Sequence, residues 1–293
     1  MGARTKLLAA ASLLAIVWLT PEPHLAAAPI FATEDSLRQY TVPETTRVRS
    51  TRIPLRDLIR KAQEGERHKY DGIQTMAYNR TVKVSIEFGG RKPHTECHEI
   101  VSRVYFRRPT QWAEVTLRKA DYDIAPDGTR TPRSEDDPNG PVQIEVGEGG
   151  SSARQLEEVP EYLQQMERFD FEIVQRHLRR DEVLYEIGFT PRSDFEILPS
   201  GRIWLLTSGY QIVREEFEFK KLPLPGILKS VSLVTREWQE VEGHWVEKRI
   251  TGRANIGIVP MFGAPKSIEV VVLYDEYKFD LPLEDAVFEG AAR

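Results

Sequence analysis

His94, Glu96 and His98 have the spacing that comes closest to a metal site in this sequence. In an extended strand they share one face, where residues two positions apart lie ~6.6 Å apart, near enough to bind one ion. His94 and His98 lie ~13 Å apart on the same scale, too far to share it. A closed site would need a further ligand from elsewhere in the chain. We therefore expect a solvated polar strand face and no bound metal.

Catalytic motifs are not recognisable elsewhere in the sequence. Ser151-Ser152 stands in a glycine-rich loop without the strand–turn–helix context of a hydrolase nucleophile. Cys97 has no adjacent base that argues for a catalytic thiol. The spacing of Asp121, Asp123 and Asp127 does not match a calcium-binding loop. The sequence therefore predicts a non-enzymatic protein without a cofactor.

Residues 1–28 have the order of a secretory signal peptide. Arg4 and Lys6 precede the apolar run Leu7–Leu19, and the small residues Ala26–Ala28 follow. The run is too short to span a bilayer, so we expect cleavage, with an uncleaved anchor as the alternative. No cysteine lies near this site, which excludes a lipid-modified N-terminus. We expect an exported protein of the bacterial periplasm.

Residues 29–293 are expected to form a single domain, because a chain of this length buries a large core without a second one. Cys97 is the single cysteine and makes no internal disulfide. The formal net charge of -5 gives no electrostatic case for nucleic acid, so we expect no nucleic-acid partner.

Alternation of apolar and polar residues is the strongest signal, and it is clearest between Val183 and Phe219. A period of two gives each strand one dry and one wet face, which is typical of an antiparallel sheet. Further strands are predicted at Met76–Phe88, His94–Arg107, Trp112–Leu117, Lys229–Glu240, His244–Asn255 and Ser267–Phe279. The predicted fold class is mainly β with a few helices.

Two segments before the first strand are expected to be helical, Thr33–Tyr40 and Pro54–Tyr70. In the second helix, Leu55, Leu58 and Ile59 form an apolar stripe. We expect this stripe to cover the inward face of the first strand, which carries Met76, Tyr78, Val82, Val84, Ile86 and Phe88.

Residues 119–154 depart from the strand pattern. They contain the turn sequences Pro126-Asp127-Gly128 and Pro138-Asn139-Gly140. One short apolar alternation, Val142, Ile144 and Val146, follows the second turn and precedes a glycine-rich stretch. We expect a mobile excursion on the edge of the sheet.

Five short segments resemble a known family. They are residues 185–191, 201–205, 210–215, 243–247 and 273–277. Together with the export signal and the helices before long strands, they resemble the LolA-like superfamily of periplasmic lipoprotein carriers and related exported proteins. The resemblance implies a strongly curved antiparallel sheet that forms a half-open β-barrel, partly covered by N-terminal helices. It also implies an apolar concave face that holds acyl chains.

Two functions follow as hypotheses. The first is an exported carrier or binding protein for a lipid or acylated ligand in the concave cavity. The alternative is an envelope protein-interaction module whose core is filled by side chains, because a curved sheet is compatible with both. The candidate ligand-binding residues are Tyr78, Val84, Phe88, Tyr185, Trp204, Phe217, Leu224, Ile227, Met261 and Phe262.

Two connections between predicted strands, Leu222–Leu228 and Gly257–Lys266, are unusually apolar for segments that normally lie in water. In an up-and-down meander both fall on the same rim of the sheet. Either they plug the open end of the barrel, or they form a mouth that contacts a ligand, a membrane surface or an envelope protein.

Overall fold

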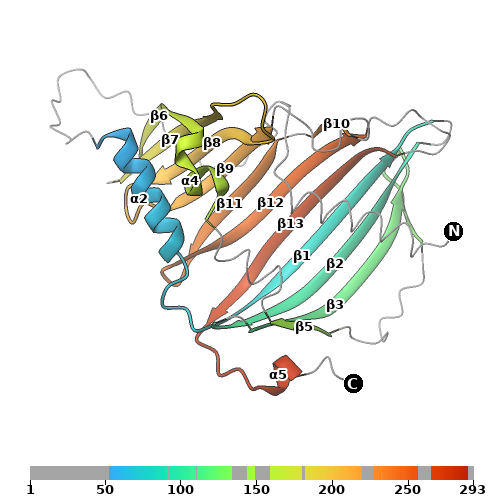
Figure 1. Ribbon diagram of the computed structural model, residues 1–293. Coiled ribbons are helices and arrows are strands. Elements are labelled where there is room, and N and C mark those ends of the chain that lie inside the picture. Colours follow the sequence, from blue (N-terminus) through green and yellow to red (C-terminus); the bar gives the residue numbers. More distant parts are fainter. Residues whose placement is uncertain are drawn as a thin grey trace.

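The computed structural model describes residues 53–90, 93–109, 111–133, 144–148, 159–179, 182–219, 228–231, 233–256 and 265–289. These residues form one 13-stranded antiparallel sheet with few helices (Figure 1). The strands are β1 Thr75–Phe88, β2 His94–Arg107, β3 Gln111–Ile124, β4 Arg130–Pro132, β5 Ile144–Glu148, β6 Phe169–Arg179, β7 Glu182–Pro191, β8 Pro199–Leu206, β9 Ile212–Phe219, β10 Leu228–Val231, β11 Val234–Val241, β12 His244–Ile256 and β13 Pro265–Phe279. The helices are α2 Leu55–His68, α4 Glu161–Gln164, the short 3-10 helix η1 Met166–Arg168 and α5 Ala286–Glu289.

The sheet runs in the order β4-β3-β2-β1-β13-β12-β11-β9-β8-β7-β6, with β5 paired to β3 and β10 paired to β12. The first long strand therefore lies beside the last one, and Val82 stands opposite Val272. The end strands β4 and β6 do not pair with each other in the described residues, so the sheet stays open. The predicted class, an open antiparallel sheet with few helices, is confirmed.

Most predicted strands are confirmed, and β6 was missed. The alternation of Phe169, Phe171 and Ile173 is lost after Ile173, because the β6–β7 ladder shifts register between Ile173 and Gln175. The predicted strand Lys229–Glu240 is divided into β10 and β11.

The predicted excursion begins later than residue 119, because β3 continues to Ile124 in pairing with β2. Two short strands follow it, β4 and β5, and both pair with β3. The part of the excursion that the structure describes therefore extends the edge of the sheet. The predicted signal peptide and the helix at Thr33–Tyr40 lie outside the described residues.

Helix α2 is confirmed, but the prediction that it covers the first strand, β1, is wrong. Leu58 and Ala62 are fully buried in a cluster with Ile187 and Ile203. Figure 1 shows α2 beside the half of the sheet that contains β6 to β9. Helical spacing identifies which residues must be buried, but not which of several apolar faces receives them. No helix among the described residues is long and apolar enough to cross a membrane.

Two clusters of buried side chains occupy the helix-facing side of the sheet. The first lies between α2, α4 and strands β6 to β9, and it includes Phe189 and Leu205. The second lies on β1, β2, β12 and β13, and it includes Met76 and Phe106. Burial of these apolar surfaces is the main source of stability of the sheet.

One row of cross-strand partners crosses both halves of this face. Directly paired residues share a face of a sheet, so the row can be followed from ladder to ladder. It runs Ile173, Ile187, Ile203, Glu215, Arg236, Ile250, Val272 and Val82. Glu215 and Arg236 form the charged pair in a row that is otherwise apolar.

Candidate functional site

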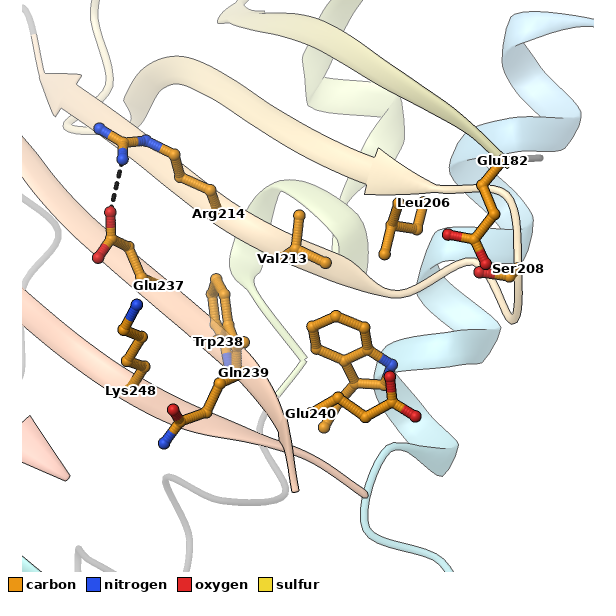
Figure 2. A pocket seen from close by; sticks show the side chains of 11 residues that line it. Glu182, Leu206, Ser208, Val213, Arg214, Glu237, Trp238, Gln239, Glu240 and Lys248 are labelled. Carbon is orange, nitrogen blue, oxygen red and sulfur yellow. Dashed lines mark hydrogen bonds and ion pairs between the residues drawn. The ribbon is translucent and has the colours of Figure 1, made fainter. Parts of the chain in front are cut away.

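Strands β9 and β11 separate from each other after four paired positions. The ladder runs from Phe217 opposite Val234 to Arg214 opposite Glu237 and stops there. Beyond Glu237, β11 continues in pairing with β12, while Ile212 of β9 pairs with β8. The separation leaves a cavity of about 890 Å³, which we call the β9–β11 opening (Figure 2).

The β9–β11 opening draws its lining from five strands and one turn, because it lies where two ladders part. Its lining residues are Glu182, Leu206, Ser208, Val213, Arg214, Glu237, Trp238, Gln239, Glu240, Trp245 and Lys248. Helices α2 and α4 lie behind it in Figure 2. Its volume is within the roughly 300–1,000 Å³ that is common for ligand sites.

Two tryptophans, Trp238 and Trp245, belong to the lining of the opening. Trp238 belongs to the first core cluster and Trp245 packs against that cluster. They lie on the two strands of the β11–β12 hairpin, which turns at Glu242 and Gly243. Large aromatic rings with polar tips are typical of binding surfaces, because they combine apolar area with a hydrogen-bond donor.

Arg214 has a fixed position at one end of the opening. It donates to Glu237 at 2.5 Å and to Glu216 at 2.9 Å, and its guanidinium lies 5.4 Å from the ring of Trp204. Figure 2 shows Lys248 beside Glu237 at this end, and Glu182 beside Ser208 at the other end. The two cations of the opening are therefore gathered at one end of it.

A group of buried charges lies under Trp238. The Lys69 ammonium stands 4.3 Å from the Trp238 ring centroid and 2.7 Å from a carboxylate oxygen of Glu66. Burial lowers the pKa of Lys69, and Glu66 opposes this change. Arg236 lies 5.2 Å from the same ring. The Trp238 side of the opening therefore packs against charged side chains from the C-terminal end of α2 and from β11.

Arg236 is held between two carboxylates. It lies 3.5 Å from Glu215 and 3.0 Å from Glu247. Burial acts to lower the pKa of Arg236, but the two carboxylates outweigh burial and raise it. Burial raises the pKa of Glu215, and Arg236 opposes that change. Tyr162 of α4 faces Glu215, and burial, with the nearby Glu215 charge, raises the pKa of its hydroxyl.

The residues predicted to line one concave cavity are divided between different places. Tyr78 belongs to the second cluster, whereas Tyr185 belongs to the first and Phe217 packs against it. Val84 is buried on β1 without belonging to either cluster, and Phe88 stacks on His94 at 4.9 Å.

Trp204 lies on the opposite face of β8. Its neighbours Ile203 and Leu205 are fully buried under α2, so strand alternation directs Trp204 to the other side, where Arg214 covers it. The remaining candidates, Leu224, Ile227, Met261 and Phe262, lie outside the described residues. The strand ends that flank their two connections meet on one rim, as predicted.

His94 and Glu96 of β2 lie close to polar residues from other segments that their spacing in the sequence did not predict. Asp123 of β3 joins His94 and Glu96, and one ligand atom of each lies within 4.8 Å of the others. Arg133 lies between the acids, 2.6 Å from Glu96 and 3.4 Å from Asp123. A guanidinium that pairs with both carboxylates opposes a bound cation.

The β9–β11 opening was not predicted from the sequence. Its position depends on where the β9–β11 ladder ends, and no residue pattern marks that point. The available signal was the pair Trp238 and Trp245, on either side of Glu242-Gly243. Two tryptophans at the tip of a hairpin indicate a surface with a use beyond sheet packing.

No family model matches the chain, and no curated protein matches it significantly. Among solved structures, a DUF1329 family protein from Desulfovibrio piger is similar with 13% identity and a TM-score of 0.35, covering 82% of this chain and 98% of that chain. A protein domain named for outer membrane lipoprotein sorting from Vibrio parahaemolyticus has 11% identity and a TM-score of 0.33, covering 79% and 96%. A LolA superfamily protein from Nitrosomonas europaea has 12% identity and a TM-score of 0.28, covering 80% and 96%.

These structures include the superfamily that the sequence pattern resembles, as predicted. At such identities and TM-scores the likeness supports no particular ligand or partner. A function for this chain has to come from its own geometry.

Proposed function

We propose that this chain is a non-enzymatic binding protein of the bacterial cell envelope that holds a segment of a partner protein in the β9–β11 opening. The observation that carries the proposal is the end of the β9–β11 ladder at Arg214 and Glu237. Past this point, on the side that faces the opening, the backbone donors and acceptors of both strands have no strand partner among the described residues.

Unpaired strand edges favour a polypeptide as the ligand. Val213 lies on one edge, next to the buried Ile212, and Trp238–Val241 forms the other. An extended segment that adds to such an edge gains main-chain hydrogen bonds, and side-chain pockets beside the edge provide specificity. The β9–β11 opening offers both the edges and the pocket.

The packing of the helix-facing side also favours this function over a carrier with a deep cavity. Tyr78 and Tyr185, both predicted to line such a cavity, are buried within clusters of protein side chains. A face that its own side chains fill leaves little space for an acyl chain.

Site-specific photo-cross-linking in the native envelope tests the proposal. Benzoylphenylalanine at Gln239, inside the opening, should give a cross-linked protein of one discrete mass. The matched control is the same residue at Leu117 of β3, which is 57% exposed and distant in the sheet order. A lipid adduct, or the same adducts from both positions, would contradict the proposal.

A second candidate is the acylated ligand, which the apolar lining of the opening favours. Trp238, Trp245, Leu206 and Val213 provide walls for a hydrocarbon chain within the same 890 Å³. Native mass spectrometry of the protein purified from its host envelope tests this candidate. A bound mass that Trp245→Ala removes would support it, and a protein that is always empty and binds no fatty-acyl probe would exclude it.

A further inference from the structure

We infer that the segment held in the β9–β11 opening carries a lysine or arginine, whose charged group lies against Trp245 between Glu182 and Glu240. The inference rests on the proposed function and specifies the chemistry of its ligand. It comes from the distribution of charges around the opening.

The carboxylates of the opening outnumber its cations. Glu182, Glu237 and Glu240 stand against Arg214 and Lys248. Glu237 already pairs with Arg214 at 2.5 Å. Among the described side chains, neither Glu182 nor Glu240 has an ion pair, and we assign both carboxylates to the ligand, although Arg179 stands opposite Glu182 in the β6–β7 ladder.

The unpaired carboxylates also lie away from the protein's own cations. Figure 2 shows Arg214 and Lys248 near Glu237, whereas Glu182 lies beside Ser208 at the opposite end. At the first end Arg214 and Lys248 are balanced by Glu216 and Glu237, whereas Glu182 at the second end attracts a ligand cation. The charges therefore determine both the sign of the ligand and its position.

Trp245 supplies the third element of a cation site. It is the direct cross-strand partner of Glu240, so the two side chains lie on the same face of the hairpin and next to each other. A cation over an indole ring gains electrostatic attraction from the ring, and an adjacent carboxylate adds to it. Trp238, in the same opening, already receives the Lys69 cation in this way at 4.3 Å.

The length of the free edge limits the segment. Trp238–Val241 offers four backbone positions, which correspond to ~13 Å of extended chain. Added to this edge, a segment of that length reaches from the Arg214 end to the Glu240 end. The partner therefore presents a short extended segment in which a basic residue is placed near one end.

Two labelled peptides test the inference on the purified mature protein. Both contain eight residues that alternate threonine and valine, one with a lysine near one end and the other with norleucine at that position. We expect the lysine peptide to bind at least about tenfold more tightly, which corresponds to about 1.4 kcal/mol. Glu240→Gln and Glu182→Gln should each reduce this preference, whereas Glu242→Gln, in the neighbouring turn but outside the lining, should preserve it.

Hydrogen exchange provides the structural readout. Binding of the lysine peptide should slow exchange at the amides of Trp238–Val241. Equal affinity for the two peptides overturns the cationic ligand, and binding of neither overturns strand addition. The proposed function fails by a different result, the absence of a protein adduct at Gln239.

Discussion

Lys69 places its ammonium 4.3 Å from the ring centroid of Trp238, so a buried cation of the helix layer supports the wall of the β9–β11 opening. Its side chain is 2% exposed, and its partner Glu66 is 7% exposed. A buried ion pair of this kind depends on both members, because either one alone is an uncompensated charge in a dry environment. The pair therefore couples the stability of the helix layer to the shape of the opening.

Lys69→Met should destabilise the protein by about 3–5 kcal/mol, because it leaves the Glu66 carboxylate buried without its cation. The double variant Lys69→Met with Glu66→Gln should recover most of the loss, since it removes both charges. Urea unfolding of the three proteins measures the effect. A single Lys69→Met variant as stable as the wild type would show that Glu66 finds another partner or becomes protonated at no cost.

Glu215→Gln should change how stability depends on pH. Burial raises the pKa of Glu215 above its usual 4.5, with Arg236 opposing the change, so the folded state holds this proton more tightly than the unfolded chain does. The contribution to stability is complete below the unfolded pKa and is lost as pH rises through the folded pKa. The stability of the wild type relative to Glu215→Gln should therefore fall as pH rises above the usual carboxyl pKa of 4.5. A difference that grows with pH would mean that the ion pair with Arg236 dominates.

Gly201→Ala should destabilise the sheet by about 3 kcal/mol or more, because the new methyl group would collide with backbone. A Cβ atom at Gly201 would lie 2.0 Å from the carbonyl oxygen of Glu216 and 2.7 Å from the Cα of Phe217. Gly188→Ala is the matched control one strand away. There the nearest atoms to the Cβ are side-chain atoms of Glu172 and Val174 on the edge strand β6, at 3.3 Å or more.

We expect Gly188→Ala to cost less than about 1 kcal/mol, because those side chains move easily. Thermal unfolding of the two variants compares the positions directly. Similar losses for both would show that β8 and β9 adjust their spacing more readily than their ladder indicates.

Periodicity in the sequence was sufficient to predict most strands and the buried stripe of α2. Val84 and Ile86, like Ile187 and Phe189, are buried at alternate positions of a strand. This alternation follows from the extended backbone itself, so it can be predicted without knowing which element packs against the strand. Which element packs against that strand is determined by the tertiary structure. Leu58 therefore could be predicted as buried, while the strands beneath it were predicted wrongly.

Two features of the site could not be located from the alternation of residues in single strands. Glu215 alternates correctly with Phe217 and is 2% exposed, yet its type predicts a solvated residue. Its burial becomes understandable only when the ladder places Arg236 opposite it. The β9–β11 opening exists because the β9–β11 ladder ends at Arg214 and Glu237. The length of a ladder depends on how two strands pair, so it cannot be predicted from either strand alone.

Gly65 of α2 tests how closely the helix controls the opening. A Cβ atom there would lie 2.6 Å from the carbonyl oxygen of Tyr210, in the β8–β9 turn that carries Ser208 of the lining. Alanine is the better helix former by about 1 kcal/mol, but the contact with backbone should outweigh this gain. We expect Gly65→Ala to lower the free energy of unfolding by about 1–3 kcal/mol. It should also change the fluorescence of the folded protein, because the turn moves relative to Trp238 and Trp245.

Glu64→Ala is the matched control in the same helix. Glu64 is exposed and pairs with Arg60 at 3.0 Å, an interaction worth at most about 0.5 kcal/mol. It should leave both stability and tryptophan fluorescence almost unchanged. If Gly65→Ala stabilises the protein instead, helix propensity has prevailed, and α2 does not press on the turn. In that case the opening would be independent of the helix layer, and ligand binding should be unaffected by the substitution.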